Sequence, residues 1–227
     1  MSITHRSEFP ELLEALASEN LPHLATLGRR ERRTAETRVR LFRSAMRLFA
    51  QRGFQNVTVE DITEAADVGK GTFFNYFESK EQVLSVMGEI QLGKVRDVLA
   101  RAEAGKQPIR TVLRDMFHRI AEEPGRSPDM TRALISTFLA SPPIRSTLAA
   151  NLAEGRRMVA RMLELGQKRG EVGPSLKPEL LARQSQQAIM GTLLLWSLRG
   201  DERLENRLDE SFQHFWRAAS VNQESNR

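Results

Sequence analysis

Apolar residues recur at intervals of three and four along most of the chain, and almost no stretch alternates in the way typical of a strand. One such stripe runs from Leu41 to Phe49, and Gly53 is placed to end that helix in the left-handed conformation. Similar stripes predict helices at Ser79–Glu103, Ile109–Glu122, Pro128–Ala140, Pro143–Arg169, Glu179–Arg199 and Leu204–Ala219. The pattern therefore predicts an all-α protein.

The segment Thr58–Phe77 has the pattern of two short helices joined by a tight turn. Thr58 is placed to cap the first helix, and the Asp61 side chain can reach back to that cap. Asp67–Gly69 supplies the turn, and the second helix begins at Lys70. A helix-turn-helix places its second helix in a DNA major groove, so we expect this segment to bind DNA.

The second of these helices has an apolar side and a small, polar side. At 100° per residue Phe73 and Phe77 share the inner face, and we assign the flanking Phe74 to the core as well. The outward side carries Gly71, Thr72 and Asn75, with Tyr76 at its edge and Lys70 at its N-terminal end. Because glycine inside a helix costs about 1 kcal/mol relative to alanine, we expect Gly71 to allow the close approach of a partner. Threonine, asparagine, tyrosine and lysine side chains can contact base edges or phosphates.

The net charge is +5, and its placement supports this interpretation. Residues Gly28–Arg52 contain nine arginines against two glutamates, whereas Gly53–Lys80 contains two lysines against five carboxylates. A basic flank beside a polar reading helix suits attraction to DNA phosphates. The run Arg29–Arg33 could lie as an arm along or in the minor groove, or it could simply be solvated.

Other bulk properties exclude several classes of protein. The chain has no cysteine, so it forms neither disulfides nor thiolate metal sites. Acidic residues interrupt the N-terminal segment, and the longest apolar run, Ala188–Leu198, is too short to span a bilayer. We therefore expect a cytoplasmic protein that is not in a membrane.

The stretch from Thr37 to Leu84 resembles the TetR/AcrR family of bacterial transcriptional regulators. The resemblance rests on Ala45, Leu48–Phe49, Gly53–Phe54, Thr58–Val59, Asp61–Ile62, Ala65–Ala66, Val68, Gly71–Phe73, Tyr76–Phe77, Ser79–Glu81 and Leu84. It implies that six residues approach DNA, namely Thr58, Lys70, Thr72, Asn75, Tyr76 and Lys80. The chain departs from the family pattern at Gly69, where a capping Ser or Thr is common. It departs again at Phe74, where a Tyr commonly contacts a phosphate.

The pattern and the resemblance together predict three parts. Residues 1–33 form an N-terminal extension with a basic arm, and residues 34–80 form a three-helix DNA-binding domain whose helix-turn-helix is 58–77. Residues 81–227 form a helical domain for ligand binding and dimerisation. The resemblance suggests that its interior holds an apolar or amphipathic small molecule, in a pocket that we assign to Met116, Phe117, Ile120, Phe138, Met158, Met162 and Met190.

Apolar stripes on the last two predicted helices indicate self-association. We expect the dimer interface to contain Ile189, Leu193, Trp196, Leu208, Phe212, Phe215 and Trp216. In the family such helices pack as a four-helix bundle between two subunits. A twofold dimer would present two reading helices about 34–36 Å apart to a palindromic site. The alternative is that both stripes close the core of a single subunit.

These features predict a sequence-specific transcriptional regulator, a homodimeric repressor that a small molecule releases from its operator. An enzyme is a poor alternative, because the four histidines (His5, His23, His118 and His214) have neither metal nor triad spacing. We expect no cofactor and no bound metal. A helical interaction module without DNA binding is a second alternative, and the salt dependence of binding distinguishes it from a regulator.

Overall fold

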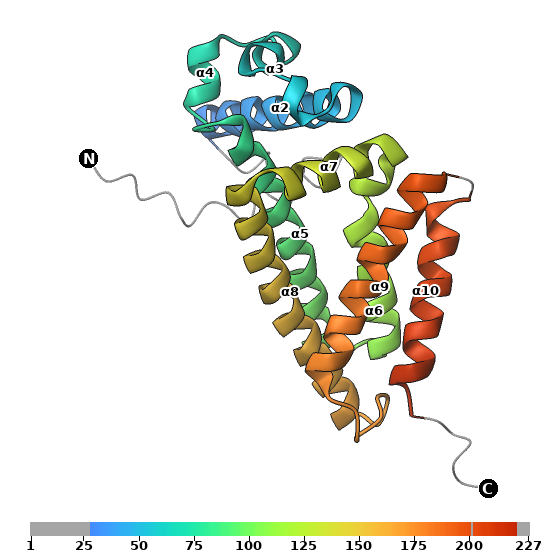
Figure 1. Ribbon diagram of the computed structural model, residues 1–227. Coiled ribbons are helices and arrows are strands. Elements are labelled where there is room, and N and C mark those ends of the chain that lie inside the picture. The colour runs from blue at the N-terminus through green and yellow to red at the C-terminus, as the bar shows by residue number, and fades with distance from the viewer. Residues whose placement is uncertain (1–27, 201, 222–227) are drawn as a thin grey trace, which may run out of the picture. The chain divides into compact units, whose positions relative to one another are not determined.

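Helices make up nearly all of the computed structural model, which describes residues 28–200 and 202–221 (Figure 1). The predicted N-terminal extension up to residue 27 lies outside the described residues. Among those that are described no β-strand forms, and Val172 and Ser220 make an isolated antiparallel bridge. The prediction of an all-α fold is confirmed. No helix within residues 28–200 and 202–221 is long and apolar enough to cross a membrane.

The chain folds as two compact units. The first contains the residues up to Gly93 together with Thr137–Leu148, and the second contains Lys94–Ser136 together with the residues from Ala149 onward. Helix α5 (Lys80–Glu103) runs from the first unit into the second. The boundary between the units therefore lies further along α5 than the predicted domain limit at residue 80.

The first unit is built on α2 (Arg29–Arg52), which packs against the 3-10 turn η2 (Phe54–Asn56) and α3 (Val59–Ala65). Helix α4 (Lys70–Phe74) packs in turn on α3. The predicted stripe of α2 is buried, as are the apolar residues of the loops and of α3 and α4 that face it: Leu41, Phe42, Ala45, Leu48, Phe49, Phe54, Val57, Ile62, Phe73 and Phe77. Close packing of these apolar side chains holds the helix-turn-helix on α2.

Gly53 ends α2 as the sequence predicts. Its N–H donates to the Phe49 carbonyl at 3.0 Å, and its φ of +76° is a conformation that side chains with a Cβ rarely adopt. The start of the helix differs from the prediction. The basic run Arg29–Arg33 forms the first turns of α2 rather than a separate arm, and the Thr34 and Thr37 hydroxyls donate to carbonyls four residues earlier. Arginine favours helix, so the run continues the helix.

The second unit holds α6 (Ile109–Ala121), η3 (Pro124–Arg126), and most of α7 (Pro128–Ala140) and α8 (Pro142–Lys168). It also holds α9 (Pro178–Arg199) and α10 (Leu204–Ala219), which lie side by side and both pack on α6 (Figure 1). The rings of Phe117 and Phe212 meet edge to face with centroids 5.2 Å apart, and those of Phe117 and Phe215 are 6.0 Å apart. This aromatic cluster forms the centre of the three-helix packing.

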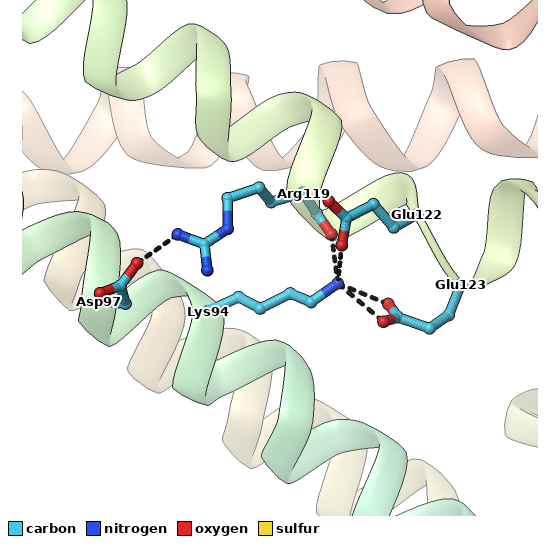
Figure 2. Close-up of polar contacts among 5 residues, drawn as sticks. All are labelled: Lys94, Asp97, Arg119, Glu122 and Glu123. Atoms are coloured by element: carbon cyan, nitrogen blue, oxygen red, sulfur yellow. Dashed lines mark hydrogen bonds and ion pairs between the residues drawn. The ribbon is translucent and has the colours of Figure 1, made fainter. Parts of the chain in front are cut away.

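A buried lysine joins α5 to the end of α6 (Figure 2). The Lys94 side chain is 5% exposed, and its Nζ donates to the Arg119 carbonyl at 2.7 Å, to Glu122 Oε2 at 2.6 Å and to both carboxylate oxygens of Glu123 at 2.8 Å. Beside it Arg119 pairs with Asp97 of α5. A buried ammonium is stable only when it is paired, and the last turn of a helix favours a cation. Both conditions are met here.

Candidate nucleic-acid interface

Helix α3 begins with the capping box that the sequence predicts. The Asp61 N–H donates to Thr58 Oγ1 at 3.1 Å, and the Thr58 N–H donates to Asp61 Oδ2 at 2.7 Å. The bonds from Thr58, first of all from its side chain, hold the pKa of Asp61 below its usual value, and the nearby Arg52 guanidinium adds to this. Val57 and Ile62 flank the cap and are fully buried, as expected of a hydrophobic staple.

The turn between α3 and α4 begins where the sequence places it. Asp67 has a φ of +52°, a left-handed conformation that aspartate tolerates better than most residues. The Val68 N–H donates to the Thr63 carbonyl at 3.0 Å, which closes the turn. Four residues therefore connect the end of α3 at Ala65 to the start of α4 at Lys70.

Helix α4 ends at Phe74, before the predicted end at Phe77, and a turn follows it, yet the predicted apolar face is buried. Phe73 and Phe77 are buried with ring centroids 5.5 Å apart, and the N–H groups of Tyr76 and Phe77 both donate to the Phe73 carbonyl. The assignment of Phe74 to the core is wrong, because its side chain is 49% exposed. Phe74 lies one position beyond Phe73 on the helix, about 100° around the axis, and so leaves the buried face.

The opposite side of α4 is open, as predicted. Gly71 and Asn75 are exposed, and Thr72 and Tyr76 are partly exposed. A Cβ placed on Gly71 would meet none of the described atoms within 4 Å. Packing within the described chain therefore gives no reason for a glycine at this helical position.

The two lysines at the predicted interface already have partners in the structure. Lys70 Nζ forms an exposed ion pair with Glu60 of α3, and this bond is the largest cause of the lowered pKa of Glu60. Lys80 Nζ donates to the Phe54 carbonyl at 3.0 Å and to the Val57 carbonyl at 2.9 Å, and it lies 4.5 Å from the centroid of the Phe54 ring. Lys80 therefore holds the end of η2, a role that the sequence analysis missed.

The residues predicted to line a ligand pocket are mostly packed into the second unit. Met116, Phe117, Met158 and Met162 are buried, and Ile120 and Met190 are partly exposed. Phe138 belongs to the first unit. A pocket of about 450 Å³ lies elsewhere, between α9 and α10, and is lined by Gln184, Ala188, Ser211, His214, Phe215 and Ala218. Within the described residues no group of acidic or histidine side chains is placed to hold a metal ion.

The structure corrects the residues assigned to the dimer interface. Six of the seven are at most 7% exposed, because they pack against their own chain: Ile189, Leu193, Trp196, Leu208, Phe212 and Phe215. Trp216 is partly exposed and stacks on Phe212 with centroids 6.1 Å apart. These stripes close the core of the subunit, which is the alternative left open by the sequence. The exposed leucines of α9 are Leu180, Leu194, Leu195 and Leu198.

Comparison with known proteins places this helix-turn-helix in a family. Residues 41–87 match the family described as bacterial regulatory proteins, tetR family. The chain is 31% identical over 156 residues to the transcriptional repressor DhaR of Mycobacterium sp. (strain GP1), a match that covers 65% of this chain and 77% of DhaR. It is 46% identical over 56 residues to the regulator TcmR of Streptomyces glaucescens, a match that covers 25% of each protein.

Solved structures agree with these matches. The TetR-family repressor FadR of Thermus thermophilus, solved in complex with lauroyl-CoA, is 28% identical, with a TM-score of 0.59 over 84% of this chain and 98% of FadR. FadR of Bacillus halodurans shares the fold at 16% identity, with a TM-score of 0.69 over 79% of this chain and 94% of that FadR. With its capped helix-turn-helix and these relatives, the chain belongs to the TetR family of bacterial regulatory proteins, and it is a DNA-binding transcriptional regulator.

Proposed function

We propose that this protein is a homodimeric repressor that binds a palindromic operator and is released from it by a small molecule. The observation that carries the proposal is the open side of α4, where Gly71 and Asn75 face solvent on a rigidly capped helix-turn-helix. A helix needs such a surface to reach base edges in the major groove. Repression agrees with the relationship to DhaR, which is itself a repressor.

In this proposal the residues of α4 and of the turn that follows it have different roles, which depend on their chemistry. Asn75 pairs with a base edge, since an amide can both donate to and accept from adenine. Thr72 contacts a base or a phosphate, and Tyr76 and Lys70 contact phosphates, with Lys70 exchanging Glu60 for DNA. Gly71 lets the backbone of the helix come close to the groove.

Residues outside α4 would add contacts to the DNA backbone in this proposal. Thr58 caps α3, where its exposed position suits a phosphate contact. Lys80 has one N–H left after its two carbonyl bonds, because an ammonium carries three donors. Along α2 the exposed arginines Arg29, Arg33, Arg40 and Arg47 fall on one face. A cationic ridge of this kind would release counterions from DNA.

The proposed dimer uses a different face of α9 from the one the sequence indicated. Helix α9 is apolar on two sides, since Leu194, Leu195 and Leu198 are exposed while Ile189 and Leu193 are buried. A helix that is apolar all round is normally covered on both sides. We assign the exposed side to a second copy of the chain, because an uncovered row of leucines favours association.

Small residues beside these leucines would let a second helix pack closely. Gly191 lies on the exposed side, where a Cβ would meet no described atom within 4 Å. Ala188, Ser211 and Ala218 line the adjoining pocket between α9 and α10. Short side chains of this kind allow close contact between helices, so this surface fits a helical partner.

We propose that the effector is amphipathic, with a long apolar chain. Met116, Phe117 and Met162 form a soft apolar interior in the second unit, and methionine repacks easily around a ligand. The related FadR of Thermus thermophilus was solved with lauroyl-CoA, a molecule of this chemical class. The ligand must bind the DNA-free state more tightly than the DNA-bound state, or it would not cause release. Helix α5, which belongs to both units, is the continuous element that would carry the change.

The test is binding to duplex DNA selected from a random pool, measured by fluorescence anisotropy at several salt concentrations. We expect the logarithm of the affinity to fall linearly with the logarithm of salt, with a slope of about −0.9 for each phosphate contacted. Asn75→Ala should relax the preference for the selected sequence. A helical interaction module would instead show no DNA binding, or no salt slope, and that result would contradict the proposal.

A further inference from the structure

The aromatic ring of Phe74 is exposed on the part of the molecule that would meet DNA. Its side chain is 49% exposed, while the neighbouring Phe73 and Phe77 are buried. Exposed apolar surface is unfavourable in water, and a large apolar side chain on a binding surface points to an apolar contact in the complex. Phenylalanine has no hydroxyl, so it cannot contact a phosphate through a hydrogen bond.

We propose that Phe74 recognises thymine by packing its ring against the C5-methyl group in the major groove. The proposal rests on the proposed function and adds a specific base to it. Thymine is the base that presents a methyl group in the major groove, and phenylalanine is one of the side chains that contact it. The ring would therefore contribute to the choice of sequence as well as to affinity.

The geometry of α4 leaves one side of the ring open. A helical side chain leans towards the residues three and four positions earlier, which for Phe74 are Gly71 and Lys70. Gly71 has no side chain, and a Cβ there would meet no described atom within 4 Å. Even a side chain as small as alanine at position 71 would lie more than 4 Å from the described atoms of the Phe74 ring, so residue 71 does not cover the ring. The same glycine that lets the backbone approach the groove also lets a base reach the ring.

The buried Phe73 side chain also supports the Phe74 ring. Phe74 meets Phe73 edge to face, with centroids 5.5 Å apart and an interplanar angle of 85°. Phe73 is fully buried, so it is a fixed support for the exposed ring. An aromatic side chain with two rotatable bonds loses little entropy on binding, which favours its use in recognition. Asn75, the next residue, is suited to adenine, so the pair favours A·T base pairs at neighbouring positions.

The experiment removes only the C5-methyl group of thymine from the DNA. After selection of an operator, each thymine of one half-site is changed in turn to deoxyuridine, and the dissociation constant is measured by fluorescence anisotropy. We expect one position at which loss of the methyl weakens wild-type binding about three- to tenfold, the scale for burying one methyl group in a tight contact. Phe74→Ala should bind more weakly and should lose this sensitivity, so that thymine and deoxyuridine bind alike.

Controls separate this inference from the proposed function. Leu139→Ala removes another exposed apolar side chain and should leave the sensitivity to deoxyuridine intact. Circular dichroism should show that Phe74→Ala keeps the helical content of the wild type, because about half of this side chain is exposed. If the wild type binds its operator but no deoxyuridine substitution changes the affinity by twofold, the inference is overturned and the proposed function stands. A selected half-site without thymine would also overturn it. If the wild type selects no DNA at all, the proposed function fails first.

Discussion

At the scale of one residue, Gly71 is unfavourable for the stability of its helix but suits a binding function. Gly69 and Gly71 flank Lys70, and a Cβ on either would meet none of the described atoms within 4 Å. Gly69 has a φ of −73°, which any residue can adopt. Gly71 lies inside α4, where alanine is more favourable by about 1 kcal/mol. The residue is therefore better explained by a partner outside the chain than by the fold.

Replacing Gly71 by alanine should raise stability and weaken DNA binding. We expect a gain of up to about 1 kcal/mol in the free energy of unfolding, from the helix propensity of alanine, measured by chemical denaturation. Operator affinity should fall at least tenfold, because the added methyl group keeps the backbone from the groove. The matched control is Gly155→Ala in α8, where a Cβ also meets no described atom within 4 Å. An equal effect of both changes on DNA binding would contradict this role for Gly71.

Local signals predicted some residues of the site correctly and missed others. The cap formed by Thr58 and Asp61 involves residues three positions apart, so it is visible in the sequence. The partners of Lys80 are 23 and 26 residues earlier in the chain, so no local pattern reveals them. The sequence places Phe74 in the core because it lacks the hydroxyl of the Tyr common at this position, although a five-residue helix buries only one face.

At the scale of elements, Lys94 fastens α5 to the end of α6. Lys94→Met should lower the free energy of unfolding by about 3 kcal/mol, because it removes the ammonium that pairs with the largely buried Glu123 carboxylate. Chemical denaturation followed by circular dichroism measures the change. Adding Glu123→Gln should recover part of the loss, since the side chain at position 123 then carries no charge.

A surface ion pair provides the comparison for Lys94. Arg161 lies 3.9 Å from Glu103, and both side chains are half exposed. Arg161→Met should therefore cost less than about 1 kcal/mol. Similar losses for the two substitutions would show that the buried pair is not a special connection between α5 and α6.

Asp209 connects α10 to α6 through charge. Its carboxylate accepts from Arg114 Nε at 2.9 Å and contacts His118 Nε2 at 2.7 Å. The bond from Arg114 is the largest cause of the lowered pKa of Asp209, and His118 lowers it further. Because the folded-state pKa is lowered, the stabilisation is complete above the unfolded-state pKa of about 3.9. It is lost as the pH falls through the folded-state value.

Asp209→Asn should remove that part of the pH dependence. Thermal unfolding measured between pH 7 and pH 3 should give a melting temperature that falls less steeply in the variant below about pH 4.5. Glu210→Gln, one residue along α10, is a control that should keep the wild-type profile. Identical slopes for wild type and Asp209→Asn would contradict the assignment.

For the whole molecule, we expect the exposed side of α9 to decide whether two copies associate. Leu198→Glu, at a side chain that is 63% exposed, should convert the dimer to a monomer, measured by sedimentation at micromolar concentration. Affinity for the full operator should then fall more than tenfold, while binding to a single half-site should change little. Leu139→Glu is the matched control on another exposed leucine. Unchanged mass of Leu198→Glu would contradict the proposed interface.

The sequence predicted the order of the helices and the bounds of α5 to α10 well, because each carries its own apolar period. It could not show which apolar side of α9 packs inward, since Leu193 and Leu195 look alike in the pattern and only one is buried. It could not show the boundary between the two units either, because α5 continues through it without a break. Which helices pack together depends on tertiary contacts that have no local signature.

The central claim is that two copies of α4 read the two halves of one DNA site. The most direct measurement is selection of duplexes by the purified full chain from a random pool, followed by sequencing of the bound fraction. We expect enrichment of an inverted repeat whose half-sites are centred about one helical turn apart, or a multiple of it. Enrichment of no sequence, or of a single unrepeated site, would contradict it.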